Sequence, residues 1–387
     1  MATTVAEIRD TYRGGYRDRP WIPRFWHGIT FPAWIRLLGR HRFRLSVLRL
    51  ATVLAITLFS VMNYLLWAVQ VLVFGRRIAR TKIDQDPIFI IGHWRSGTTL
   101  LHELLVLDGR HTYPSTYACF APNHYLVTRR VFPRILSMLM PDRRPMDNMP
   151  AGWDRPQEDE FALCAMGVPS PYNVMAFPNE PQQEAAYLNL QGLSPRALAR
   201  WKRAFVWFLK CLTLVDPRRI VLKSPPHTGR VRVLLDLFPR ARFIHIVRDP
   251  RVVFPSTLNL WKRLYTDQGL QTPNFEGLEE RVFATFDRMY AAFERDRALI
   301  PPSQISEVRY EDLVRSPTAE MRRIYDDLGL DGFDDVLPAL EEYLASQSGY
   351  QKNRYSISPE TRLAIGRRWG EYIAKYGYSD TAEQDAA

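Results

Sequence analysis

The segment 87–99 constrains the fold of this chain more than any other. It reads PIFIIGHWRSGTT, an apolar and largely β-branched run followed by a glycine-rich turn. Leucines at helical spacing come after the turn, so the segment predicts a buried strand, a turn and a helix. In that order the three elements direct several backbone N–H groups and the positive end of a helix dipole at one point. We expect an anion to bind at that point.

The residues of the turn indicate which anion fits. A nucleoside-triphosphate loop would read G-x-x-x-x-G-K-[ST], and its lysine would reach the β- and γ-phosphates. Here Gly92 and Gly97 keep the glycine spacing, but Thr98 stands where that lysine would be. The cation of the loop is instead Arg95. The turn therefore favours a shorter anion. A P-loop nucleotide phosphotransferase or NTPase is the alternative, and the missing lysine counts against it.

The turn resembles the 5′-phosphosulfate loop of sulfotransferases that use 3′-phosphoadenosine 5′-phosphosulfate (PAPS), in which Lys or Arg precedes Ser-Gly-Thr-Thr. It is most similar to bacterial members with Arg in the loop, and more distantly similar to tyrosylprotein sulfotransferases. The resemblance covers residues 84–378. It implies a catalytic role for Arg95 and a set of donor contacts from the loop: Arg95, Ser96, Gly97, Thr98 and Thr99.

A second segment strengthens the resemblance. The strand-like run 243–247 stops at Arg248, which places this arginine where open α/β sheets bind their ligands. We expect Pro255 to break the chain just before Ser256. In the family, an Arg at a strand end and a Ser eight residues later hold the 3′-phosphate, and Arg248 with Ser256 reproduces that spacing. Lys223 resembles the family lysine that steadies the bridging oxygen as the sulfuryl group departs.

A third segment, EVRYEDLVRSP at 307–317, resembles the strand and turn after which the family places an aromatic residue on the adenine. The resemblance makes Tyr310 the candidate for stacking or edge contact. The alternative interpretation is a tyrosine that simply packs at the end of a strand before an N-capped helix.

Sulfuryl transfer also needs a base for the acceptor hydroxyl. His227 is the first candidate, because cytosolic family members carry a histidine just after the corresponding lysine, although only two residues on. Tyrosylprotein sulfotransferases use a glutamate after the first helix, where this chain has Thr116. Glu158 and Glu160, at the start of a helix predicted over 157–168, are the second candidates. Acidic residues are also favoured there by the helix dipole alone.

Charge and cysteine content indicate which classes of binding partner and which cell compartment to expect. Lys and Arg total 52 against 41 Asp and Glu, a formal net charge of +11 that favours anionic partners. We expect no nucleic-acid partner, because no zinc pattern, helix-turn-helix signature or RNA-binding aromatic motif is present. The three cysteines are widely spaced and form neither a disulfide framework nor a metal pair, which indicates a reducing cytoplasm. No histidine spacing supports a metal, so we expect no metal.

The first 83 residues differ in character from the rest. Arginines alternate there with Trp and Phe, a mixture that suits a lipid headgroup layer. Residues 50–74 are uncharged and long enough to cross a bilayer, and basic residues follow them. Three interpretations remain open: a membrane span, a helix lying in the interface, and a core helix of the enzyme. We expect association with the cytoplasmic face of the membrane, because the nucleotide donor is made in the cytoplasm.

These observations predict two parts: residues 1–83 as an N-terminal membrane-associating helical segment, and residues 84–387 as a sulfotransferase domain. The domain is expected to be α/β, with a P-loop-like parallel sheet flanked by helices. It would fold and bind the donor without residues 1–82. The predicted reaction is metal-independent transfer of a sulfuryl group from PAPS to a hydroxyl of a small-molecule, lipid or glycolipid acceptor. An inactive membrane adaptor on this fold is a further alternative. The acceptor stays open, because acceptor pockets are built by variable loops, here expected at 111–156 and 262–280. Whether the chain forms a homodimer also stays open.

Overall fold

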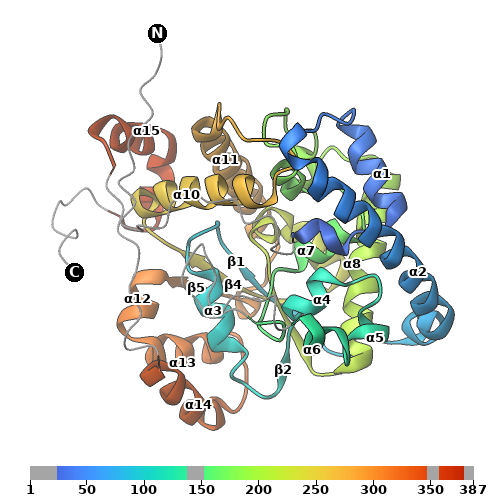
Figure 1. The fold of residues 1–387 in the computed structure, drawn as a ribbon. Coiled ribbons are helices and arrows are strands. Elements are labelled where there is room, and N and C mark those ends of the chain that lie inside the picture. The colour runs from blue at the N-terminus through green and yellow to red at the C-terminus, as the bar shows by residue number, and fades with distance from the viewer. Residues whose placement is uncertain (1–23, 137–151, 347–356, 379–387) are drawn as a thin grey trace.

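The computed structural model describes residues 24–136, 152–346 and 357–378, and its core is a parallel β-sheet (Figure 1). The strands follow the order β2-β3-β1-β4-β5, and each neighbouring pair is parallel. Ile88 of the central strand lies opposite Val221 on one side and Arg242 on the other. The strands are β1 (Ile88–Ile91), β2 (His111–Thr112), β3 (Arg219–Lys223), β4 (Arg242–Val247) and β5 (Ile305–Arg309).

Helices surround the sheet. The α-helices are α1 (Phe31–Arg40), α2 (Leu50–Arg80), α3 (Thr98–Leu105), α4 (Thr116–Phe120), α5 (Tyr125–Thr128), α6 (Phe132–Leu136), α7 (Asp159–Ala165), α8 (Pro195–Val215), α9 (Val231–Leu237), α10 (Pro250–Gln268), α11 (Leu278–Arg297), α12 (Tyr310–Arg315), α13 (Pro317–Asp327), α14 (Phe333–Ser346) and α15 (Pro359–Lys375). Short 3-10 helices are η1 (Phe25–Gly28), η2 (Val47–Arg49), η4 (Pro171–Met175), η5 (Ala185–Leu188), η6 (Pro225–Arg230) and η7 (Pro302–Gln304).

The central strand is apolar throughout because both faces of the sheet are covered. Phe89 and Ile91 point into the larger core, which includes residues of α8, α10 and α11. Ile88 and Ile90 point into a smaller core with residues of α3, α13 and α14. These two layers of helices confirm the predicted parallel α/β architecture, and the predicted strand, turn and helix of residues 88–105 are present as β1 and α3.

The carboxyl ends of the parallel strands meet at one edge of the sheet. Lys223 is the last residue of β3, Arg248 follows β4 and Tyr310 follows β5, so three of the predicted site residues come from strand ends. The expected break before Ser256 is wrong. Pro255 lies inside α10, which continues to Gln268, and both residues are buried against the core. Proline removes only one backbone donor there, and burial on several sides keeps the helix continuous.

The N-terminal segment packs into the core of the domain. Trp26 of η1 and Trp34 of α1 are fully buried in the same hydrophobic cluster as Phe89 of the central strand. The Trp34 indole N–H also donates to Thr57 Oγ1 of α2 at 2.9 Å. Residue 83 therefore marks a change of composition while the two parts share one core. The expected independence of the domain from residues 1–82 stays a prediction, which the shared core does not favour.

Of the residues that the structure describes, one helical stretch, Val47–Arg80, is long and apolar enough to cross a membrane. Only 28% of its most apolar window is buried. This exposure disfavours the interpretation as a core helix, because a core helix of a soluble protein is mostly buried.

The shared core predicts a large effect of Trp34→Ala. Removal of this buried indole is expected to lower the free energy of unfolding by about 3–5 kcal/mol. Phe43→Ala is the control, because Phe43 precedes α2 and is 55% exposed. Chemical denaturation of both variants measures the difference. Equal stability of the two variants would show that the N-terminal segment does not belong to the core.

Candidate active site

The turn between β1 and α3 has an unusual backbone. Arg95 adopts φ 69° and Gly97 φ 102°, so two residues of the loop occupy the left-handed region. Ser96 lies between them and is buried, and its hydroxyl donates to His93 O at 2.7 Å. Alternation of this kind turns successive N–H groups toward one side and forms a concave anion site next to the start of α3.

Two contacts hold the glycines of the turn in place. The Gly92 N–H donates to Thr228 Oγ1 of η6 at 2.7 Å, and the Thr228 hydroxyl reaches Gly92 O at 3.2 Å. At Gly97 an added Cβ would lie 2.3 Å from the Tyr310 ring. Tyr310 therefore packs directly on the loop, which requires glycine at position 97. The contact between Thr228 and the loop depends on the approach of η6 to β1 and was not predicted.

The predicted donor-binding residues outside the loop come together at its edge. Arg95 Nε donates to Ser256 Oγ at 2.9 Å, and Arg248 Nη1 donates to Arg95 O at 3.0 Å. The Arg248 guanidinium lies over the Tyr310 ring, with Cζ 3.9 Å from its centroid. Two cations, a hydroxyl and an aromatic ring thus gather beside the glycine turn, which is the chemistry that a nucleotide with two phosphate groups requires.

The predicted catalytic lysine forms a buried ion pair. Lys223 Nζ lies 2.7 Å from Glu158 Oε1 and 3.4 Å from Thr99 Oγ1. The Lys223 side chain is 1% exposed and that of Glu158 is 13% exposed. This contact brings the end of β3, the residue before α7 and the first turn of α3 to one place. Glu158 is thus the predicted carboxylate that lies beside the loop.

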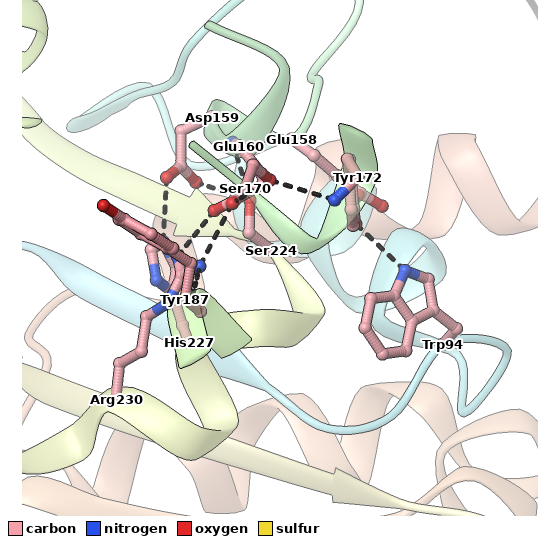
Figure 2. Close-up of polar contacts among 10 residues, drawn as sticks. All are labelled: Trp94, Glu158, Asp159, Glu160, Ser170, Tyr172, Tyr187, Ser224, His227 and Arg230. Atoms are coloured by element: carbon pink, nitrogen blue, oxygen red, sulfur yellow. Dashed lines mark hydrogen bonds and ion pairs between the residues drawn. The ribbon is translucent and has the colours of Figure 1, made fainter. Parts of the chain in front are cut away.

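Glu158 has a second partner that was not predicted. The buried Tyr172 hydroxyl donates to Glu158 Oε2, and the Trp94 indole N–H donates to Tyr172 OH at 2.9 Å (Figure 2). Burial raises the pKa of Tyr172 well above its ordinary value, and the Glu158 charge adds to this effect, so Tyr172 stays a neutral donor. Trp94 lies within the motif HWRSGTT, but nothing near Tyr172 in the sequence marks it.

His227 and the two acidic residues that follow Glu158 lie deeper. His227 Nε2 is 2.8 Å from Asp159 Oδ2, and the ring is fully buried with its neighbours Phe89 and Phe205 (Figure 2). Burial would raise the pKa of Asp159, but His227 and its other partners hold it below the ordinary value. The carboxylate of Glu160 is fully buried and accepts hydrogen bonds from Arg230 at 2.5 and 3.0 Å.

These positions separate the three candidate bases. His227 and Glu160 have no exposed side-chain surface and their contacts fix the start of α7. Glu158 keeps some exposure and contacts Lys223. The geometry favours Glu158, and the role of His227 as base stays a prediction that the burial of its ring does not favour.

A cavity adjoins the loop. The enclosed space measures about 10 Å³, which is room for about one water molecule. Its walls are largely apolar and come from the loop, η4, α10 and α11, and they include Trp94, Pro171, Val174, Trp261, Tyr265 and Val282. Trp261 and Tyr265 lie at or near the predicted acceptor loop 262–280. Of the other predicted acceptor loop, 111–156, residues 137–151 lie outside the described residues.

Within the described residues, no group of three or more His, Cys, Asp or Glu side chains could hold a metal ion. Cys119, Cys164 and Cys211 are free and buried. The expected independence from metals stays a prediction.

A parallel sheet with a left-handed glycine turn, flanking arginines and a buried Lys–Glu pair at its carboxyl edge defines a P-loop-like group-transfer enzyme. The model of the Sulfotransferase family matches residues 87–335, and the chain belongs to that family. It is a sulfotransferase.

Relatives and solved structures agree. The chain is 46% identical over 362 residues to omega-hydroxy-beta-dihydromenaquinone-9 sulfotransferase Stf3 of Mycobacterium tuberculosis (strain CDC 1551 / Oshkosh), covering 94% of this chain and 93% of the relative. Sulfotransferase STF1 from Mycobacterium tuberculosis H37Rv matches with a TM-score of 0.63 at 18% identity, covering 88% of this chain and 90% of that one. STF9 from Mycobacterium avium also has a TM-score of 0.63, at 21% identity and with 81% and 82% covered. These two structures share the fold.

Gly97→Ala tests the shape of the loop. An alanine at this position would have to keep the left-handed backbone conformation, which costs about 1–2 kcal/mol of stability. Its Cβ would also collide with the Tyr310 ring. Gly277→Ala is the matched control, because Gly277 has φ 67° and no atom within 4 Å of the added Cβ. We expect Gly97→Ala to reduce thermal stability more than the control and to abolish most binding of adenosine 3′,5′-bisphosphate in calorimetry. Equal effects of the two substitutions would contradict the contact between Tyr310 and the loop.

Proposed function

We propose that this enzyme transfers the sulfuryl group of PAPS to a hydroxyl of a lipid-like acceptor. The observation that carries the proposal is the meeting of the left-handed Arg95 loop with the Lys223–Glu158 pair. Membership of the Sulfotransferase family supports the donor and the absence of the Walker lysine argues against a nucleoside triphosphate.

Each donor contact has a residue that suits it. The loop residues 95–99 and the start of α3 hold the 5′-phosphosulfate, because their N–H groups and Arg95 offset its charge. Arg248 and Ser256 hold the 3′-phosphate. Tyr310 lies against both the loop and Arg248, which supports its assignment to the adenine.

The reaction follows from the remaining polar groups. Glu158 accepts the proton of the attacking hydroxyl, whose oxygen forms the new bond to sulfur. The bond from sulfur to the 5′-phosphate oxygen breaks, and that oxygen keeps the electron pair. Lys223 and Arg95 donate hydrogen bonds to the departing phosphate and stabilise the charge that develops on it. The Tyr172 hydroxyl holds Glu158 in position by a hydrogen bond to Oε2, the carboxylate oxygen that does not contact Lys223.

The proposed acceptor class rests on the relative. The 46% identical relative carries the name of a sulfotransferase for a hydroxylated menaquinone, and the match extends over nearly the whole of both chains. The cavity beside Trp94 has room for about one water molecule in this structure, so the proposed acceptor class does not rest on it. We therefore infer a hydroxylated, largely apolar lipid as acceptor. Such a substrate resides in membranes, which supports action at the cytoplasmic face.

Nucleotide binding tests the donor. We expect tight binding of adenosine 3′,5′-bisphosphate without magnesium and weak binding of ATP, because the loop lacks the lysine for a triphosphate. Arg248→Ala should lower the affinity for the bisphosphate by about 10- to 100-fold, because a charged hydrogen bond is lost. Arg315→Ala, on the exposed side of α12, is the control. Isothermal calorimetry gives each affinity, and tighter, magnesium-dependent ATP binding would overturn the donor assignment.

Turnover separates the candidate bases. Glu158→Gln should reduce kcat by about 10²- to 10⁴-fold while binding of the bisphosphate stays within a few-fold. His227→Asn should chiefly lower stability, since the buried His227–Asp159 contact fixes α7. Steady-state assays with radiolabelled PAPS and thermal unfolding of both variants decide the question. An active Glu158→Gln enzyme beside an inactive but stably folded His227→Asn enzyme would return the base to His227.

A further inference from the structure

The long helix α2 buries several polar side chains and exposes many apolar ones. Its buried side chains include Thr52, Ser60, Asn63 and Gln70, whereas Leu54, Leu58, Leu65 and Leu72 are 62–87% exposed. In a soluble protein the apolar face of such a helix is normally turned inward. Exposed apolar surface and buried polar side chains are the informative departures from that rule.

Specific hydrogen bonds hold the polar face of α2 against the enzyme. Asn63 Nδ2 donates to His27 O at 2.6 Å and to Ile29 O at 3.0 Å, and its Oδ1 lies 3.1 Å from His124 Nε2. Further along, the Leu126 N–H donates to Gln70 Oε1 at 2.8 Å. A helix that crossed a bilayer would have to leave these partners and carry both amides into hydrocarbon. The contacts therefore disfavour a membrane span.

The exposed face has the composition of a membrane interface. Tyr64 and Trp67 stack on each other there, with ring centroids 5.4 Å apart, and each is more than one-third exposed. The stretch 47–80 contains no acidic residue, while Arg76, Arg77 and Arg80 are exposed at its end. Such basic side chains beside an apolar face complement anionic lipid headgroups.

A second copy of the chain is a poorer occupant of this face. Leu58, Leu65 and Leu72 repeat every seven residues, as in a two-helix seam. Exposed apolar side chains extend on either side of that stripe, however, and a seam would leave them uncovered. A parallel pair would also set the three terminal arginines of α2 against their own copies, without an acidic residue on the helix to offset them.

We propose that α2 lies flat in the surface of an anionic bilayer. Its apolar face would lie in the lipid, and its polar face would stay hydrogen-bonded to the catalytic domain. Figure 1 shows α2 at the edge of the molecule, next to α1 and α8. This placement rests on the proposed lipid acceptor for its functional meaning, because it would hold the active site close to a substrate in the membrane. The Asn63 contacts lead to η1, where Phe25 stacks on Phe161 of α7 at 3.9 Å, and α7 starts directly after Glu158.

Vesicle flotation of the full chain tests the proposal. Leu58→Glu with Leu65→Glu changes the exposed face of α2. Leu299→Glu with Leu363→Glu is the control of equal charge, because both residues are exposed elsewhere. We expect the unaltered protein and the control to float with phosphatidylcholine–phosphatidylglycerol vesicles. The partition coefficient of the α2 variant onto these vesicles should be at least about tenfold lower. All three should bind adenosine 3′,5′-bisphosphate equally, which separates this test from that of the proposed function.

Two results would overturn the proposal. The first is equal flotation of the two double variants. The second is an unaltered protein that does not float and forms a dimer in light scattering that only Leu58→Glu with Leu65→Glu dissociates, which would assign the face to a second copy.

Labelling tests the flat orientation separately. The three native cysteines are buried, so single cysteines can be placed at the exposed positions Arg42 and Lys82 on either side of α2. An impermeant maleimide added outside the vesicles should label both in the membrane-bound protein. Labelling of only one of them would indicate a span and overturn the flat arrangement.

Discussion

The site depends on one backbone constraint, the left-handed turn that joins β1 to α3. Arg95 and Gly97 adopt positive φ, and this conformation presents the N–H groups of the loop while it turns the Arg95 side chain toward Ser256. Thr228 holds one end of the turn through Gly92 and Tyr310 covers the other at Gly97. Because a non-glycine residue in this region is strained, the surrounding contacts must hold it in place. The proposed nucleotide contacts of the loop depend on that support.

The three consecutive acidic residues Glu158, Asp159 and Glu160 differ in burial and in partners. Asp159 and Glu160 are fully buried, and each is paired with a cation or histidine of η6, since a buried carboxylate without a partner would be strongly destabilising. These pairs fasten the start of α7 to the segment after β3. Glu158 is thereby set against Lys223 at the border of the solvent, held also by Tyr172. A general base needs both a fixed position and access to its substrate, and of the three carboxylates Glu158 combines them.

In the proposed arrangement the N-terminal segment connects the same site with the membrane in a way that composition alone would not suggest. Apolar length favours a span, yet the amides of Asn63 and Gln70 are committed to the enzyme. Trp26 and Trp34 then make the segment part of the catalytic core. An enzyme whose acceptor is a lipid gains from such an arrangement, because a membrane-facing helix that is rigidly attached to the domain keeps the active site at a constant height above the bilayer.

The local elements and the family resemblance can be read from the amino-acid sequence alone. The apolar run 88–91, the glycine spacing at 92 and 97, and the strand end at Arg248 are short-range signals, and the parallel sheet follows from their alternation with helices. Only the tertiary structure decided how Glu158 meets Lys223, why His227 is enclosed, and which face of α2 is turned outward. Those outcomes depend on contacts between residues 36 to 68 positions apart, and no periodicity or spacing in the chain specifies which distant side chains will form an ion pair or a hydrogen bond.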